Sequence, residues 1–202
     1  MSPEPSANRT YTGVGSRETP DPVAREMRQI AAALARAGWT LRSGGAPGAD
    51  TFFEEGARSV PEARMEIFLP WKGFNGNTSA LFGVTPRALE IASQIHPRWD
   101  YLSPAAMKLH GRNVYQVLGR TLDRPSQAVI CWTKDGATNA AQTSSATGGT
   151  GTAIRLASRY GVSVFNLGDP NSRRDLASWL AGQGIEGVLD LPPTPPTQLE
   201  LI

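Results

Sequence analysis

The sequence has little of several residues that direct a chain to a particular class of protein. It contains one cysteine, Cys131, and two histidines among 202 residues. A single cysteine excludes an intrachain disulfide and fits a reducing compartment, so we expect a cytoplasmic protein. The histidines have no cysteine, aspartate or glutamate at metal-ligand spacing, so we expect no metal site.

Long hydrophobic runs are also missing. No apolar stretch approaches the roughly 20 residues of a membrane-spanning helix, and the N-terminus, MSPEPSANR, has no apolar signal-peptide core. The formal net charge is +2, which is too small to indicate nucleic-acid binding by itself. Three of the 20 basic residues are lysine, so 17 are arginine, the side chain that suits bidentate phosphate contacts. We expect no membrane partner, and a ligand selected by a local site rather than by overall charge.

What the sequence does contain is a regular alternation of strand and helix patterns. Hydrophobic residues make up 40% of the chain, enough for one α/β domain with a full core. Alternating strands and helices imply a Rossmann-like, mainly parallel sheet with helices on both faces. The expected strands are Thr10–Val14, Trp39–Ser43, Met65–Leu69, Gln127–Thr133 and Val162–Leu167. The expected helices are Val23–Ala37, Ala49–Ser59, Pro86–Ile95, Pro104–Leu122, Gly151–Tyr160 and Ser172–Ala181.

The two ends of the chain fall outside this alternation. Residues 1–9 are polar, and we expect them to be disordered ahead of a domain at residues 10–182. Residues 183–202 contain the run PPTPPT and predict a proline-rich tail, which is either a solvated terminus or a docking segment for a partner.

Three glycine-rich turns precede helices: GVGSRETP at residues 13–20, SGGAPGAD at residues 43–50 and TGGTGTAIR at residues 147–155. In a parallel sheet such turns open on one common edge, so we expect them to converge. Glycine lets a phosphate reach the backbone amides of a helix N-terminus, and Ser or Thr hydroxyls add donors. The alternative is that the glycines serve close packing. None of the turns matches the G-x-G-x-x-G dinucleotide pattern or the P-loop.

Charged and polar side chains near the turns complete the candidate site. Arg17, at the mouth of the first turn, is the best candidate for a phosphate clamp, and Arg112 with Asn113 forms a polar pair inside an apolar helix. Asp50 either caps and braces the second turn or takes part in ligand contact or catalysis. The polar residues 134–147 predict a mobile lid, from which Lys134 reaches ligand phosphate. The candidate ligand-binding residues are Gly13, Gly15, Ser16, Arg17, Ser43, Gly44, Gly45, Gly48, Asp50, Arg112, Asn113, Lys134, Gly148, Gly149, Thr150, Gly151, Thr152 and Arg155.

The runs GVGSR, SGGAPGAD, GRN and GGTGTAIRLA, in this order, resemble the Rossmann-like core of the DNA-processing protein A (DprA/Smf) family. That core belongs to the superfamily that also contains the Lonely Guy (LOG) phosphoribohydrolases. The family's G-S-R, S-G-x-A-x-G-x-D and R-N patterns fall in these runs, and the resemblance covers residues 10–168. By match, the pocket residues are Arg17, Ser43, Gly44, Gly48, Asp50, Arg112 and Asn113.

The resemblance implies a basic pocket for single-stranded DNA and a role in loading a recombinase onto that DNA during recombination, with a recombinase and a second copy of the chain as partners. Nothing in the 202 residues supplies the extra helical domains that many DprA proteins carry. In length the chain therefore resembles the compact relatives encoded by phages or mobile elements.

LOG enzymes resemble the chain at P-G-G-x-G-T-x-x-E, where the glutamate helps to cleave an N-glycosidic bond. Thr147 stands here in place of the proline and Arg155 in place of the glutamate. The second change removes an acid–base group and adds positive charge. The sequence therefore favours ligand binding over hydrolysis.

The leading hypothesis is a non-catalytic, cofactor-free, DprA-like protein that binds single-stranded DNA or a phosphate-bearing nucleotide in the glycine-rich crevice. Trp71 and Phe74 are available for base stacking. One alternative is a sensor or sequestering protein for a small nucleotide. Another is a LOG-like nucleotide N-glycosidase that uses Asp50, Glu54 or Glu55.

Overall fold

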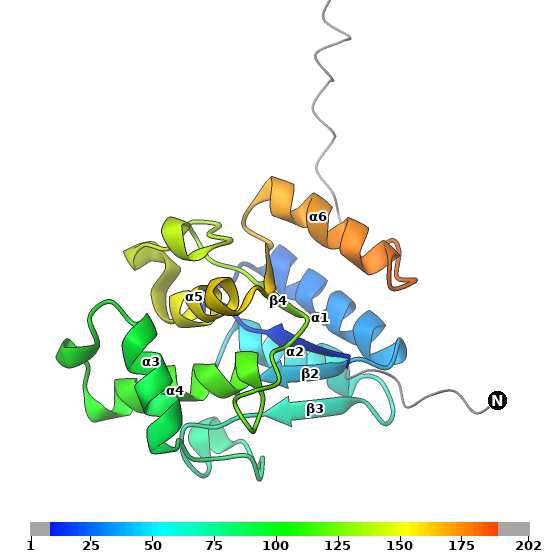
Figure 1. The fold of residues 1–202 in the computed structure, drawn as a ribbon. Coiled ribbons are helices and arrows are strands. Elements are labelled where there is room, and N and C mark those ends of the chain that lie inside the picture. The colour runs from blue at the N-terminus through cyan, green and yellow to red at the C-terminus, as the bar shows by residue number, and fades with distance from the viewer. Residues whose placement is uncertain (1–8, 190–202) are drawn as a thin grey trace, which may run out of the picture.

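Five short strands form a single parallel sheet in the computed structural model, which describes residues 9–189 (Figure 1). The strand order is β3-β2-β1-β4-β5, and each expected strand begins within one residue of an observed one. This sheet confirms the Rossmann-like α/β fold. The strands are β1 (Thr10–Gly13), β2 (Thr40–Ser43), β3 (Arg64–Ile67), β4 (Ala128–Cys131) and β5 (Ser163–Asn166).

The position of β1 in the middle of the sheet determines where a ligand can enter. Tyr11 of β1 pairs with Leu41 of β2 on one side and with Ala128 of β4 on the other. The chain therefore adds strands outward from β1 in both directions, and a crevice opens beyond the carboxyl ends of β1 and β4. Beyond the ends of β1 and β4, Ser16 N donates to Trp132 O at 3.0 Å. This hydrogen bond keeps the segments that follow the two strands side by side.

Helices cover both faces of the sheet (Figure 1). The first face carries α1 (Asp21–Arg36), α2 (Ala49–Arg58) and α6 (Pro170–Ala181). The second carries α3 (Pro86–Ile95), α4 (Pro104–Leu118) and α5 (Gly151–Tyr160). Helix α4 ends four residues before the expected Leu122, because Gly119 follows it with a φ of 74° and a positive φ interrupts helical geometry.

Each face of the sheet has its own hydrophobic cluster. On the first face, the buried Trp39 packs edge-on against Trp179 with ring centroids 5.0 Å apart. On the second face, Phe68 stacks on Tyr115 at 5.7 Å, and Cys131 is fully buried in the same cluster. Burying one such large side chain stabilises the fold by about 1.5–3 kcal/mol. Two filled clusters hold the sheet edge, and hence the crevice, in place.

The packed chain continues past residue 182. Ile185 is 8% exposed and belongs to the cluster on the first face. Most of the N-terminal segment 1–9, for which we expect disorder, and the proline run at residues 192–197 lie outside the described residues. Within residues 9–189, no helix has both the length and the hydropathy of a membrane span.

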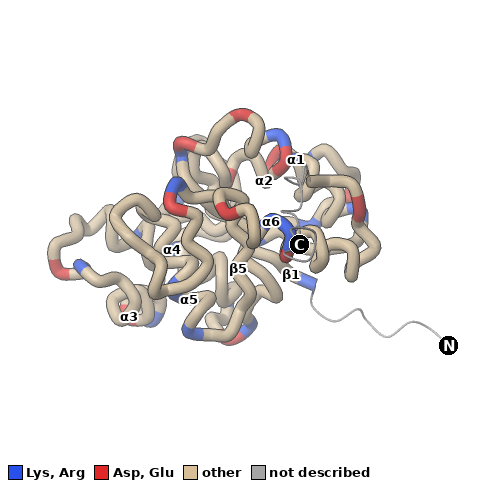
Figure 2. Tube along the Cα trace, turned by 90° about the horizontal axis from the view of Figure 1, so that it is seen from above, with Lys and Arg blue, Asp and Glu red and all other residues tan. Residues whose placement is uncertain are grey.

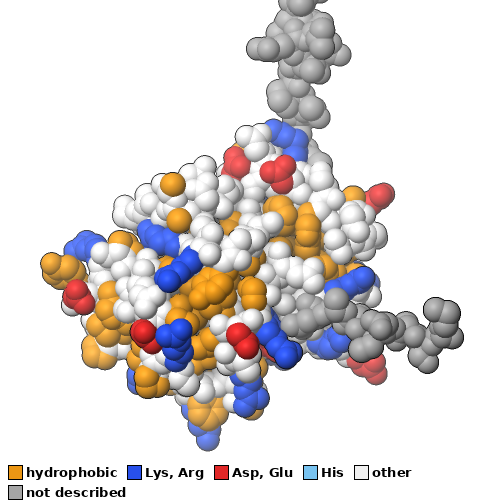
Figure 3. Space-filling view, in the orientation of Figure 1, with side chains coloured by type: hydrophobic (Ala, Val, Ile, Leu, Met, Phe, Trp, Pro, Cys, Tyr) orange, Lys and Arg blue, Asp and Glu red, His pale blue; other side chains and the backbone are white. Residues whose placement is uncertain are grey.

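The charged residues among residues 9–189 are of mixed sign along the chain. Basic and acidic positions are interspersed along the trace in Figure 2, and the basic side chains on the face shown in Figure 3 are scattered among hydrophobic and uncharged ones. A long track of phosphates would be held by a continuous stripe of cations. The face shown in Figure 3 has no such stripe, so an anion site on it would be compact.

Candidate phosphate-binding site

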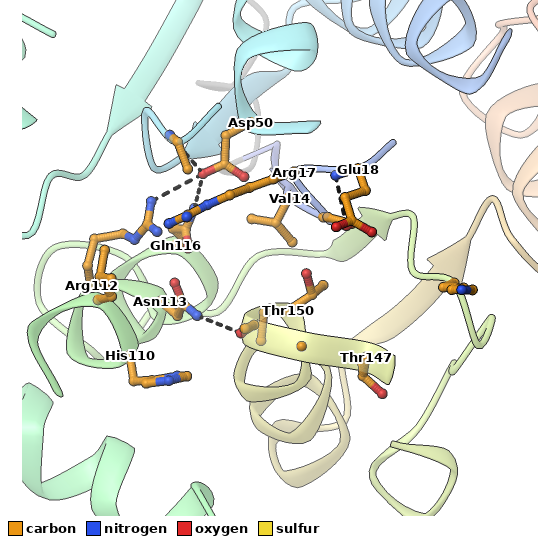
Figure 4. A pocket seen from close by; sticks show the side chains of 18 of the residues that line it. Val14, Arg17, Glu18, Asp50, His110, Arg112, Asn113, Gln116, Thr147 and Thr150 are labelled. Atoms are coloured by element: carbon orange, nitrogen blue, oxygen red, sulfur yellow. Dashed lines mark hydrogen bonds and ion pairs between the residues drawn. The ribbon is translucent and has the colours of Figure 1, made fainter. Parts of the chain in front are cut away.

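A cavity of about 570 Å³ opens at the carboxyl edge of the sheet (Figure 4). Its walls are the turn after β1, the inward side of α4, and the 3₁₀ segment η4 (Ser145–Thr150) that leads into α5. The volume lies within the range of small-molecule sites. The turns after β1 and before α5 are therefore brought together across the cavity, with α4 beneath them.

The structure brings some of the candidate residues to the cavity and places others behind its walls. Those that line the cavity are Gly15, Ser16, Arg17, Asp50, Arg112, Asn113, Lys134, Gly148, Gly149 and Thr150. Those outside its lining are Gly13, Ser43, Gly44, Gly45, Gly48, Glu54, Gly151, Thr152 and Arg155.

A buried ion pair lies under the cavity. The Arg112 guanidinium of α4 donates through Nη1 to Asp50 Oδ2 of α2 at 3.1 Å and also to the carbonyl oxygen of Gly44. Gln116 Nε2 and the Ala46 N–H reach the same Asp50 oxygen at 3.4 Å each. These contacts brace the second turn against α4. Of the two roles expected for Asp50, they correspond to bracing and not to ligand contact.

The charges of this pair largely cancel. Burial raises the pKa of Asp50, and Arg112 acts against that shift; burial likewise lowers the pKa of Arg112. Because a guanidinium keeps its proton in proteins, the pair adds almost no net charge to the cavity. Arg112 Nε is buried and has no hydrogen-bond partner within residues 9–189.

Close packing explains several glycines of the first two turns. A Cβ on Gly44 would lie 1.4 Å from Arg112 Nη1, and a Cβ on Gly13 would lie 2.6 Å from the Phe53 ring. Gly48 has a φ of +84°, and its Cβ would meet the backbone of Arg17 and Ser16 at 2.6 Å. These glycines let the two turns and α4 touch one another.

The third turn differs, because two of its glycines, Gly148 and Gly149, face open space. A Cβ on Gly148 or Gly149 would meet no atom within 4 Å. Asn113 Nδ2 of α4 holds the turn from below by donating to the Gly149 carbonyl oxygen at 3.1 Å. The backbone is therefore accessible from the cavity side, where a ligand can approach it closely.

Helices α1, α2 and α5, which follow the first, second and third glycine-rich turns, lack side-chain caps. The N-cap residues Pro20 of α1, Gly48 of α2 and Thr150 of α5 accept no side-chain cap hydrogen bond. By contrast, α3, α4 and α6 are capped by Thr85, Ser103 and Asp169. The Ala49 N–H of α2 donates to the Ser16 carbonyl oxygen, and the Gly151 N–H of α5 donates to the carbonyl oxygens of Gly148 and Gly149. What these N-termini offer to an anion is therefore mainly the positive end of each helix dipole.

Arg17 and Lys134 are the cations of the cavity lining that lie outside the Arg112–Asp50 ion pair. Both are exposed, both line it, and neither makes an ion pair within residues 9–189. In Figure 4 Arg17 extends across the opening toward Asp50 and Gln116. Glu18 is the nearby acid in the lining.

The expected lid, residues 134–147, is tied down at several points in this structure. The Asp135 carboxylate accepts from Ser144 Oγ at 2.7 Å and from Thr147 Oγ1. Partial burial acts to raise the pKa of Asp135, but hydrogen bonds from Thr147, Ser144 and Thr133 outweigh it and hold the pKa at about 2. The segment thus forms one wall of the cavity, and its opening stays a prediction.

The acidic candidates for catalysis are poorly placed for it. Asp50 is committed to Arg112, and Glu54 is 7% exposed, accepting from Asn77 at 3.2 Å and pairing with Arg58. The pKa of Glu54 is raised by burial and by Asp50. Glu55 pairs with Arg28 at 2.7 Å.

The aromatic candidates lie outside the cavity lining. Phe74 is 7% exposed and its ring lies 5.9 Å from the Arg112 guanidinium carbon, so it packs against the buried ion pair. Trp71 is 38% exposed and contacts Phe74 edge-on. Of these two rings, Trp71 is the one with an exposed surface on which a base can stack.

Sequence reasoning missed part of the α4 wall. His110, Gln116, Ala106 and Leu109 all line the cavity. The signal was available, because positions three, four and seven residues from Asn113 share its helix face. Extending the polar pair along that face would have found them.

Comparison with known proteins identifies the fold. No protein-family model and no curated protein sequence matches the chain. The solved structure of DNA processing protein A from Helicobacter pylori matches with a TM-score of 0.50 and 19% identity, over 91% of this chain and 76% of that one. The chain has a DprA-like Rossmann-type fold. A Moco carrier protein from Chlamydomonas rheinhardtii matches with a TM-score of 0.49 and 16% identity, over 88% of this chain and 87% of that one.

Proposed function

We propose that this protein binds the phosphate groups of single-stranded DNA or of a nucleotide in the cavity, without catalysing a reaction. One observation carries the proposal. Two cations that make no ion pair within residues 9–189, Arg17 and Lys134, line the same cavity as the open backbone of Gly148 and Gly149 at the start of α5, which has no side-chain cap. Cations, an open backbone and a positive helix end around one cavity make an anion site.

Single-stranded DNA is the leading ligand. The Helicobacter pylori protein with this fold is described as binding single-stranded DNA, and Trp71, four residues after the end of β3, offers one exposed ring. Single strands are held by backbone contacts together with base stacking. Recombinase loading and self-association remain further predictions of the DprA resemblance.

A small nucleotide is the second candidate, and the charge count favours it. Two free cations neutralise only a few phosphates, and a cavity of about 570 Å³ encloses a single nucleotide-sized ligand. An N-glycosidase is disfavoured, because general acid–base catalysis needs a carboxyl within reach of the ligand and the candidates are engaged in ion pairs.

The experiment is a titration of fluorescent oligothymidylate and of dTMP, read by anisotropy and by competition. Arg17→Ala and Lys134→Ala remove the free cations. Arg120→Ala, beyond the end of α4, and Lys108→Ala, on its exposed side, are the matched controls because neither lines the cavity. Loss of a charge-assisted contact of about 1.5–3 kcal/mol weakens binding roughly ten- to a hundredfold.

We expect the controls to bind like the parent and all five proteins to melt at similar temperatures. Arg17 makes no ion pair within residues 9–189, so its removal should change the unfolding free energy by less than about 1 kcal/mol. With two phosphates contacted, log Kd should change with log salt concentration with a slope of about 1.4. Parent-like binding by Arg17→Ala would reject the site, and a much steeper slope would reject a compact footprint.

A further inference from the structure

His110 is a cavity-lining residue to which the proposed function gives no role. It lies on α4, three residues before Asn113, and its Nδ1 is 2.8 Å from Thr152 Oγ1 in the first turn of α5. Figure 4 shows the ring extending from α4 toward α5. The Thr152 contact fixes the ring, and Nε2 has no hydrogen-bond partner within residues 9–189. The ring is therefore held in the cavity lining with one nitrogen that has no protein partner within that range.

The groups that surround this imidazole are basic or neutral. His96, which follows α3, has its ring centroid 4.3 Å away, while Arg112 acts from α4 and Arg155 from α5. Burial first, and then these three neighbours, lower the pKa of His110 to about 4. No carboxylate contributes to that balance, so His110 is neutral at pH 7 and an anion placed beside it would reverse the shift.

Charge counting separates two candidate anions by whether they require a proton on His110. The charged cavity-lining residues are Arg17, Lys134 and Arg112 against Asp50 and Glu18, which leaves a net charge of +1 when His110 is neutral. An internal phosphodiester carries one negative charge, whereas a phosphate monoester approaches two at pH 7. Protonation of His110 raises the cavity to +2 and balances a monoester.

We infer that the cavity holds a terminal phosphate monoester and that His110 takes up a proton when this dianion binds. The imidazolium then donates from Nε2 to a phosphate oxygen and from Nδ1 to the Thr152 hydroxyl. The inference rests on the proposed function and specifies its ligand. The monoester belongs either to the end of a single strand or to a free mononucleotide, which share this chemistry.

The test is calorimetric binding at pH 6.5 in two buffers with different ionisation enthalpies, which gives the protons bound per ligand. The probes are dTMP, 5′-phosphorylated tetrathymidylate and the same oligonucleotide with a 5′-hydroxyl. His110→Gln is compared with the parent, and Lys108→Ala is the control on the same helix because Lys108 is exposed and does not line the cavity. Thr152→Val, which releases the ring from its hydroxyl partner, is a second variant that leaves the imidazole in place.

When phosphorylated probes bind, we expect the parent and Lys108→Ala to take up a fraction of a proton that His110→Gln does not take up. Conversion of the probe's own phosphate to the dianion releases protons equally in all variants, so the difference between proteins isolates His110. His110→Gln should weaken the binding of the phosphorylated probes about tenfold and change the binding of the 5′-hydroxyl probe little. Thr152→Val should reduce the proton uptake. Binding of dTMP but not of the phosphorylated strand assigns the site to a mononucleotide; the two binding alike supports a strand end as well.

Two results would overturn the inference and leave the proposed function standing. One is equal affinity for the 5′-phosphorylated and 5′-hydroxyl strands, and the other is equal proton uptake by the parent and His110→Gln. If the folded parent binds none of the three probes, the proposed function fails and the inference fails with it.

Discussion

Gly44→Ala tests why the second turn contains glycine. In the structure, Gly44 has no positive φ, so alanine is compatible with its backbone, but a Cβ there would lie 1.4 Å from Arg112 Nη1 and 2.5 Å from Gln116 Nε2. The methyl group and the guanidinium cannot occupy the same space. We therefore expect Gly44→Ala to expel the Arg112 head group from its contacts with Asp50 and the Gly44 carbonyl.

The magnitude follows from the burial of the pair. The side chains of Arg112 and Asp50 are 7% and 5% exposed, and breaking a buried ion pair from one side costs about 3–5 kcal/mol. A domain of this size loses about 2–4 °C of melting temperature for each kcal/mol, so the expected drop is about 6–20 °C. Thermal and urea unfolding, followed by tryptophan fluorescence and circular dichroism, measure it.

A double-mutant cycle with Arg112→Ala shows whether the displaced guanidinium causes the loss. Arg112→Ala alone should destabilise by a similar amount, because it leaves Asp50 buried without its partner. The double variant should then be little worse than either single one, since both remove the same contact. Additive losses, or a Gly44→Ala protein that melts within about 2 °C of the parent, would refute the packing explanation.

Three further predictions concern the cavity walls. Gly149→Ala should leave the melting temperature nearly unchanged, because its methyl group meets no atom within 4 Å, yet weaken nucleotide binding in the anisotropy assay; unchanged affinity would mean that no ligand approaches this backbone. Asp135→Asn should speed proteolysis within residues 134–147 by weakening the contacts to Ser144 and Thr147, and bound nucleotide should slow it; cutting that ligand does not affect would argue against a lid. Because the pKa of folded His110 is lowered to about 4 from 6.5, the unfolded chain binds the extra proton between these values, and stability falls as pH drops through that window. His110→Gln should flatten this fall in urea unfolding at pH 7 and pH 5, and parallel curves would contradict it.

The periodicity of the chain was sufficient to predict the sheet. Apolar runs such as Gln127–Thr133 and the alanine-rich amphipathic segment after Pro22 have the spacing of buried strands and covering helices, and this spacing depends on local sequence alone. The DprA resemblance predicted the same fold, and the solved structure with that fold agrees. Helix ends were harder to place, as at Gly119, because a stop depends on backbone conformation as well as residue type.

Convergence of the first and third turns on one cavity also follows from the sequence, since all strands of a parallel sheet end at the same edge. What only the tertiary structure decided is the role of each polar residue there. Arg112 lies 62 residues from Asp50 along the chain, and no local pattern indicates that the two neutralise each other. Burial and contact across the fold therefore separate the glycines that packing requires, such as Gly44, from those open to a ligand, such as Gly149. The same long-range packing of α4 against α5 places His110 beside Thr152 and makes a histidine without metal-ligand neighbours part of the cavity wall.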